Sequence, residues 1–218
     1  MEWRKHFLLV LWMVIALAAG SFDAAWAAET GYFRNYGQVR LGLNEFKGDF
    51  EDAGYDTGGN LSVAYGRYLN RYLVLEAALD FFGTEHDIHG STPTAGSYKR
   101  EDTIGVMAFL ATVKGEWPAG PLTIFGGGGA GLYLLALDSE ITTANIGDFD
   151  EDESDSVFGL HIVTGVNYDI TNRFFAGVQG LYRWTDDIDI RKSVGTVPVR
   201  VEGNLNGYTV TLTGGFRF

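Results

Sequence analysis

The stretch that decides the fold is residues 208–218, which read Tyr-Thr-Val-Thr-Leu-Thr-Gly-Gly-Phe-Arg-Phe. Over its first six positions, apolar residues alternate with threonines. Because successive side chains of a β-strand point to opposite faces, such alternation gives the strand one apolar and one polar face. The stretch therefore predicts a C-terminal strand that is buried on one side only.

The same alternation recurs along most of the chain. Apolar residues occupy every second position in five further segments, near residues 38–44, 60–66, 73–81, 158–168 and 174–184. Two more candidate strands, at about 103–116 and 122–137, alternate less regularly, and the pattern leaves open which of their residues share a face. With the C-terminal stretch, these segments make eight predicted strands.

The connections between these strands alternate in length. Short ones lie at residues 69–71, 118–121 and 170–173, and long polar ones lie at 47–57, 83–102, 138–156 and 186–204. Short turns at one end and long loops at the other are typical of outer-membrane barrels, and no such alternation is expected of a soluble sandwich. We therefore predict an all-β fold, an eight-stranded antiparallel up-and-down transmembrane β-barrel.

The N-terminal segment differs from the rest of the chain. Two basic residues precede an apolar run over residues 7–19, which is too short for a membrane helix of about 20 residues. An Ala-x-Ala cleavage site ends at Ala27. We predict a secretory signal peptide at residues 1–27, with cleavage after Ala28 as an alternative, and a barrel domain at residues 28–218.

The composition excludes several classes of function. The chain contains 30 glycines and no cysteine, and 16 Lys and Arg against 28 Asp and Glu give a formal net charge of −12. Without cysteine there are no disulfide scaffolds, thiol nucleophiles or thiolate metal sites. An acidic chain also lacks the basic face that binding to nucleic acid requires, so no nucleic-acid partner is expected.

Aromatic residues gather near the predicted strand ends. Amphipathic rings prefer the headgroup layers of a membrane, so two girdles of them are expected on a membrane barrel. β-propensity alone also enriches aromatic residues in strands and is the alternative explanation. The predicted interface aromatics are Tyr68, Tyr72, Trp117 and Tyr168 at the short-turn end and Trp184 and Tyr208 at the long-loop end.

Together, the signal peptide, the eight alternating strands and the terminal Phe216-Arg-Phe218 resemble the small outer-membrane β-barrel family, which includes OmpA-type, OmpX-type and opacity-type barrels. The resemblance covers essentially all of residues 30–218. It implies the outer membrane of a Gram-negative bacterium, outer-membrane lipids as partners, and recognition of Phe216 and Phe218 by the outer-membrane assembly machinery. No peptidoglycan-binding domain follows the predicted barrel, so a wall-anchoring role is not expected.

Charged residues occupy predicted inward positions. Counting from the short turns places three of them, Arg40, Glu76 and Lys114, in a low layer, and three others, Asp80, His161 and Arg183, in a higher layer. Each layer contains both signs, so the charges can pair instead of remaining unpaired in a desolvated interior. The favoured interpretation is a structural plug, and the alternative is a gated ion path opened by re-pairing. If the plug is real, replacing Arg183 and Asp80 together by Ala should raise conductance.

Three motifs suggest ligand sites. Residues 126–131 contain G-x-G-x-x-G, but a strand follows instead of the helix that a dinucleotide site needs. Residues 85–89 hold candidate metal ligands without a second pair. The acidic segment 138–156 suggests weak binding of divalent cations but departs from the calcium-loop pattern, and charge repulsion within a solvated loop is the favoured interpretation. No cofactor and no metal site are expected.

Three functional hypotheses remain from the sequence. The favoured one is a non-enzymatic barrel with a structural or surface-interaction role through long acidic extracellular loops. The second is a narrow gated channel for ions or small solutes. The third is a lipid A-modifying enzyme, which is disfavoured because His86, His89 and His161 lack a serine and a carboxylate held beside them on a rigid element.

Overall fold

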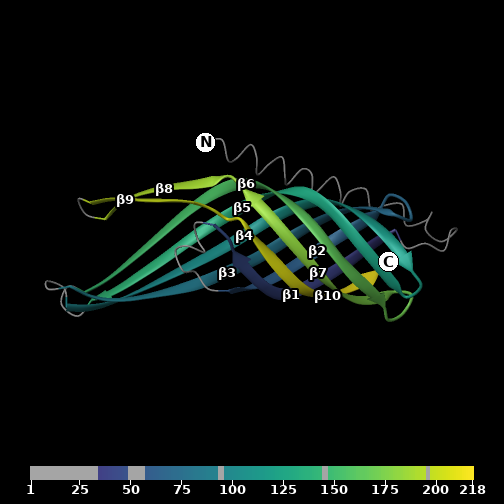
Figure 1. Cartoon of the computed structure of the whole chain (residues 1–218), viewed down its shortest axis with the longest axis horizontal. Coiled ribbons are helices and arrows are strands. Elements are labelled where there is room, and N and C mark those ends of the chain that lie inside the picture. Colours follow the sequence, from purple (N-terminus) through teal and green to yellow (C-terminus); the bar gives the residue numbers. More distant parts are fainter. Residues whose placement is uncertain (1–33, 49–56, 93–95, 144–146, 195–196) are drawn as a thin grey trace.

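A computed structural model shows a closed antiparallel β-barrel (Figure 1). It describes residues 34–48, 57–92, 96–143, 147–194 and 197–218, with the side chains of 85–103, 137–154 and 188–202 left aside. The predicted signal peptide at residues 1–27 lies outside these ranges. Within them, no helix has the length and apolar character needed to cross a membrane.

Eight strands close the barrel in the ring order β1-β10-β7-β6-β5-β4-β3-β2. Their bounds are β1 Asn35–Phe46, β2 Gly58–Tyr68, β3 Leu73–Thr92, β4 Gly96–Ala119, β5 Leu122–Thr143, β6 Gly147–Asp169, β7 Phe174–Thr185 and β10 Gly207–Arg217. Every neighbouring pair is antiparallel, and β10 closes the ring against β1 with Leu41 opposite Leu212. The predicted eight-stranded antiparallel barrel is confirmed.

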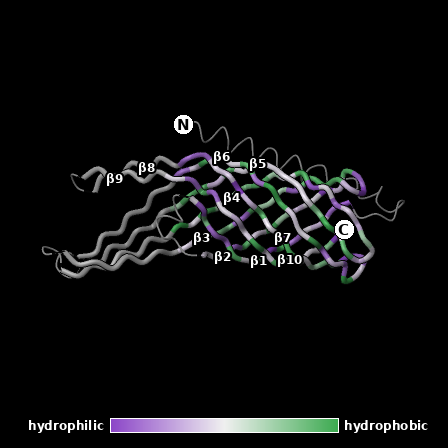
Figure 2. The backbone as a smooth tube through the Cα atoms, in the orientation of Figure 1, coloured by the Kyte–Doolittle hydropathy of each residue, from purple (hydrophilic) through white to green (hydrophobic). Residues whose placement is uncertain are grey.

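The C-terminal stretch shows how the two faces are used. Its apolar residues point outward, with Leu212 69% exposed, whereas Thr209, Thr211 and Thr213 are buried inside the barrel. This polarity is the reverse of that of a soluble protein and fits a barrel whose outer surface meets lipid. The hydrophobic and hydrophilic residues alternate along the barrel strands in Figure 2.

The two irregular strands also acquire a definite facing. In the half of β4 that follows Gly96, the described inward residues are apolar, at Ile104, Val106 and Ala108. In the half that leads to the short β4–β5 turn they are polar, at Thr112 and Lys114. Because apolar residues occupy both faces of the upper half of β4, the alternation disappears there. This explains why the sequence pattern left the facing open.

Three of the four segments predicted as long loops consist largely of strands instead. Most of residues 83–102 and 138–156 continues the strands, since β3 pairs with β4 up to Thr92 opposite Gly96, and β5 with β6 up to Thr143 opposite Gly147. Residues 186–204 contain a two-stranded hairpin of β8 (Asp187–Val194) and β9 (Val197–Asn204). Its alternating Ile and Val residues are a strand signal. Most of the fourth loop, 47–57, lies outside the described residues.

As a result, the barrel has one long side and one short side. Strands β3 to β6 continue together well past the ends of the other four and project from one end of the barrel, as does the β8–β9 hairpin (Figure 1). The opposite end carries the short turns. There, Asn70 Oδ1 accepts hydrogen bonds from the backbone N–H groups of Tyr72 and Leu73, at 2.8 and 2.9 Å, so the side chain itself holds the β2–β3 turn.

Candidate functional site

The barrel interior contains a connected group of charged and polar side chains, which we call the charge cluster. All six residues predicted as inward charges are buried. Three of them, Arg40, Glu76 and Lys114, meet in this cluster. Its other members are Tyr36, Gln38 and Gln179.

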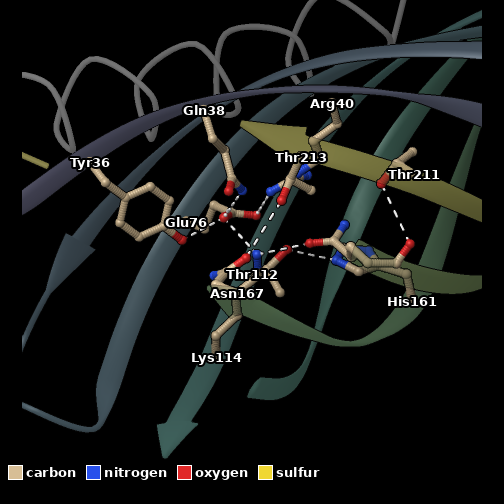
Figure 3. Close-up of polar contacts among 11 residues, drawn as sticks. Tyr36, Gln38, Arg40, Glu76, Thr112, Lys114, His161, Asn167, Thr211 and Thr213 are labelled. Carbon is tan, nitrogen blue, oxygen red and sulfur yellow. Dashed lines mark hydrogen bonds and ion pairs between the residues drawn. The ribbon is translucent and has the colours of Figure 1, made fainter. Parts of the chain in front are cut away.

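Glu76 on β3 is the centre of the charge cluster (Figure 3). Its Oε2 accepts hydrogen bonds from Tyr36 Oη at 2.6 Å, Gln38 Nε2 at 2.9 Å and Lys114 Nζ at 2.6 Å. Its Oε1 accepts from Arg40 Nη2. A carboxylate with this many charge-assisted partners is well compensated for its loss of water.

The charge cluster crosses the barrel lumen. Lys114 on β4 donates a second hydrogen bond, at 3.2 Å, to Gln179 Oε1 on β7. Strands β4 and β7 lie three places apart in the ring, as do β4 and β1, so this bonding reaches across the interior. An eight-stranded barrel is only wide enough for its own side chains. The cluster therefore fills the lumen at this height.

Inward-facing glycines make several of these contacts possible. Tyr36, Gly66 and Glu76 are register partners on three adjacent strands, β1, β2 and β3. The Tyr36 ring lies over Gly66, where a Cβ atom would come within 2.1 Å of it. The tyrosine can reach the carboxylate two strands away because the middle strand has no side chain at this position.

The same arrangement recurs twice more in the ring. Gly129 on β5 lies between Thr112 and His161, whose Oγ1 and Nε2 are 2.8 Å apart. Gly177 on β7 lies between Asn167 and Thr213, whose side chains bond at 3.5 Å. A Cβ atom would come within 2.9 Å of the His161 ring in the first row and within 2.3 Å of Asn167 Oδ1 in the second. We call these three sets of residues the glycine-centred rows.

His161 is placed differently from its predicted layer. It bonds to Thr112, which is the register partner of Glu76, so it lies beside the charge cluster and not in a separate upper layer. The prediction counted residues from the turns and assumed equal heights. Strands of a closed barrel are tilted and staggered, so equal counts on distant strands do not give equal heights.

Arg183 contacts residues outside its predicted layer. Its Nε donates to the Leu205 backbone carbonyl at 2.7 Å, and its Nη1 donates to Asn44 Oδ1 at 2.6 Å. Its guanidinium carbon also lies 4.2 Å from the centre of the Phe82 ring. These partners come from the hairpin end, which is closer to Arg183 than the sequence count suggested.

Around Arg183, apolar side chains fill the hairpin end of the lumen. We call this group the apolar cap; its members include Phe46, Phe82, Ile104, Tyr133, Leu135 and Leu205, all at most 6% exposed. Between the cap and the charge cluster lie two buried polar atoms without a hydrogen-bond partner, Ser62 Oγ and Asp80 Oδ1, and Arg40 Nε of the cluster itself also has none. The charge cluster and the apolar cap thus fill the interior at two heights, with a polar zone between them.

The comparison with protein families identifies the chain. The model of the outer membrane protein beta-barrel domain family matches residues 14–218. The chain belongs to this family. It is an outer-membrane β-barrel protein, and no curated protein matches it.

Several solved structures of outer-membrane proteins are similar to this barrel protein. OprG from Pseudomonas aeruginosa is 13% identical, with a TM-score of 0.55, over 86% of this chain and 97% of OprG. The N-terminal barrel domain of OprF from the same organism is 14% identical, with a TM-score of 0.47, over 86% and 100%. Ail, the attachment invasion locus protein of Yersinia pestis, is 14% identical, with a TM-score of 0.47, over 85% and 99%. At 13% identity, the OprG match concerns the fold alone.

On the outer surface of this outer-membrane barrel, five of the six predicted interface aromatics are exposed: Tyr72, Trp117, Tyr168, Trp184 and Tyr208. The prediction for the sixth, Tyr68, is wrong. This residue packs inside the barrel against Tyr36 and donates a hydrogen bond to Glu116 Oε2 at 3.0 Å. Tyr68 is an even number of positions from the inward Asn60, so the alternation of β2 already carried this signal.

The two C-terminal phenylalanines face outward at the barrel seam. Phe218 is 52% exposed, and Phe216 packs against Phe174 of β7 with ring centres 5.0 Å apart. The rings of Phe216 and Phe218 are stacked, with centres 6.1 Å apart. Both rings thus lie on the surface formed by the last strand.

The ligand motifs of the sequence are only partly within the described side chains. Residues 126–131 lie inside β5, as expected, and contain no helix N-terminus. The side chains of the candidate metal ligands at residues 85–89 lie outside the description, as do those of residues 138–154 in the acidic segment 138–156. Among the side chains that are described, no group of three His, Asp or Glu residues is arranged to hold a metal ion.

Sequence reasoning missed the uncharged members of the charge cluster. Tyr36 and Gln38 share the inward face of β1 with Arg40, and Gln179 shares that of β7 with Arg183. The alternation that identified the charged residues could therefore have identified these three. No pattern in the sequence indicated that Tyr36 and Gln38 would bond to Glu76, or that Gln179 would bond to Lys114.

Proposed function

We propose that this chain is a non-enzymatic outer-membrane barrel with a closed lumen, which serves as a scaffold for surface interaction. The observation that carries the proposal is the charge cluster, in which both oxygens of Glu76 are bonded to partners on other strands. An ion passing this height would have to separate buried opposite charges, and leaving one charge of a buried pair uncompensated costs about 3–5 kcal/mol. The apolar cap is a second obstacle on the same path.

The projecting strands support the surface part of the proposal. Strands β3 to β6 present a continuous sheet beyond the rest of the barrel. Residues 138–156 at its end contain eight acidic residues and no Lys or Arg. A strongly negative tip favours partners that are basic or that supply cations. On this proposal, the short turns face the periplasm and the hairpins face outward.

Conductance of the refolded chain in a planar bilayer tests the closed lumen. We expect a silent bilayer when the inserted protein is folded, as judged by a heat-dependent shift on a gel, with a general porin as the positive control. Steady, discrete openings of the wild-type chain would overturn the proposal. The polar zone around Ser62 and Asp80 favours a narrow channel as the second candidate, and such openings would establish it.

An epitope inserted at residues 144–146 tests the outward orientation. We expect antibody to bind intact cells that carry this insertion. A matched insertion after Gly120, in the short β4–β5 turn, should be bound only after the cells are permeabilised. The reverse pattern would contradict the orientation.

The proposal also includes assembly and excludes catalysis. Recognition of Phe216 and Phe218 by the outer-membrane assembly machinery predicts that replacing both by Ala lowers the amount of folded barrel in cells. Lipid A from cells that overproduce the protein is expected to keep its mass. A changed lipid A mass that depends on His161 would indicate an enzyme instead.

A further inference from the structure

A groove crosses the outer surface of the barrel near the hairpin end. It has a volume of about 710 Å³, is more open than enclosed, and its lining is almost entirely apolar. Four adjacent strands, β2 to β5, each contribute three consecutive residues to it. The floor of the groove follows one row of register partners across these strands: Gly59, Gly83, Gly105 and Ala136.

The groove opens towards the membrane and not into the lumen. In each set of three residues, the middle one is buried and faces the interior, as Phe82 and Val106 do. The outer two therefore face the lipid side, since neighbouring residues of a strand point to opposite faces. Because the outward positions of the central row are occupied by Gly or Ala, the backbone itself forms the floor.

Large apolar side chains form a wall along one side of the groove. Leu61 and Phe81 are 46% and 42% exposed and lie on the side towards the short turns, together with Met107 and Leu134. These residues belong to the same outward band as Leu41 and Leu43. The groove is thus continuous with the surface that meets membrane lipid.

We propose that this groove binds one acyl chain of a membrane lipid, held across strands β2 to β5. Four strands about 4.8 Å apart give the row a length of roughly 14 Å. This length suits an extended hydrocarbon segment, which gains dispersion contacts with the exposed backbone beneath it and with the apolar wall beside it. The nearly complete lack of polar lining leaves no partner for a headgroup, so the acyl chain is the part of the lipid that is bound.

Two glycines of the floor allow a direct test. A Cβ atom on Gly59 would meet no atom within 4 Å, and one on Gly105 would meet only the Ala136 carbonyl oxygen, at 4.0 Å. Leucine at either position is therefore accommodated by the barrel and fills the groove. Gly83 is unsuitable, since its Cβ atom would lie 2.6 Å from the Ile104 carbonyl oxygen. Gly214 on β10 also faces outward in open space, and Gly214→Leu is the matched control away from the groove.

Native mass spectrometry measures the bound lipid. The mature protein and its variants are folded in detergent micelles and titrated with dimyristoylphosphatidylglycerol. The spectra then give the fraction of protein molecules that retain one lipid. We expect wild type and Gly214→Leu to retain one lipid, and the double variant Gly59→Leu/Gly105→Leu to bind it about tenfold more weakly, the loss expected for about two methylene contacts. If the double variant does not fold, the single variants Gly59→Leu and Gly105→Leu are compared with the wild type in its place.

Three results would overturn the proposal. Equal retention by wild type and the groove variants would indicate a non-specific lipid layer. Absence of retained lipid in the wild type would show that the groove binds no acyl chain even when lipid is supplied. A second copy of the protein bound to the wild type and lost in the double variant would instead make the groove an interface between two barrels.

Discussion

Removing the charge of Glu76 tests the energetic importance of the charge cluster. Glu76→Gln preserves the shape of the side chain but leaves Arg40 and Lys114 without the carboxylate that both contact. All three side chains are at most 3% exposed. Breaking a buried pair by removal of one partner costs about 3–5 kcal/mol, because the remaining charge stays desolvated. We expect a loss of this size in the free energy of unfolding.

The chain supplies its own control at the short-turn end. Arg217 Nη1 and Asp169 Oδ1 form an ion pair at 2.8 Å with side chains 12% and 32% exposed. Partly exposed pairs contribute about 0–1 kcal/mol, so Asp169→Asn should cost at most about 1 kcal/mol. The contrast between the two substitutions separates burial from the mere presence of an ion pair.

Denaturant unfolding of the barrel in lipid vesicles provides the measurement, with tryptophan fluorescence and the gel shift as two readouts. The wild type, Glu76→Gln, Asp169→Asn and Lys114→Met are compared. Lys114→Met should cost less than Glu76→Gln, since Glu76 retains Arg40 and two neutral donors. A loss below about 1 kcal/mol for Glu76→Gln, equal to that of Asp169→Asn, would refute the reasoning.

Three further predictions concern folded stability and use the same assay. Gly66→Ala should cost about 1–3 kcal/mol by overpacking, because its Cβ atom would overlap a tyrosine ring, whereas Gly37→Ala, which meets no atom within 4 Å, should change stability by less than about 0.5 kcal/mol; equal effects would contradict the role of the glycine. Tyr68→Phe should cost about 1–3 kcal/mol by leaving a buried carboxylate with one donor fewer, and the exposed Tyr72→Phe should be neutral; a neutral Tyr68→Phe would show that the hydroxyl is dispensable. Leu41→Arg, on the lipid face midway along its strand, should cost about 2–4 kcal/mol in a bilayer, and a smaller cost would place that residue near a membrane surface.

The barrel itself was predictable because its signal is local. Alternation such as that of residues 208–213 depends only on the two faces of one strand, and each strand repeats it independently. The signal failed in the upper half of β4, where Ile104 and Val106 face an apolar interior and the contrast between the faces disappears. It also failed at the β8–β9 hairpin, where polar residues between the Ile and Val positions suggested a loop.

The charge cluster was predictable only in part. Parity along a strand is enough to place Arg40, Glu76 and Lys114 inside. Which inward residues meet depends on the stagger of strands around the ring, and this is a property of the closed barrel and not of any one segment. His161 and Arg183 were assigned to the wrong neighbours for this reason. No sequence pattern indicated that the register would bring two partners to the glycines at positions 66 and 177.

Because its strands differ in length, one side of this barrel extends well beyond the other. The pairing of β3 with β2 ends at Gly83, and β3 continues to Thr92. At about 3.4 Å per residue, this difference corresponds to roughly 30 Å along the strand, or roughly 20–25 Å of height for strands tilted by about 40°. A molecule that bound the tip of the sheet would therefore lie well beyond the rim at which the short strands end. On the proposed role in surface interaction, the barrel would anchor a partner at a distance from the membrane that the four long strands set.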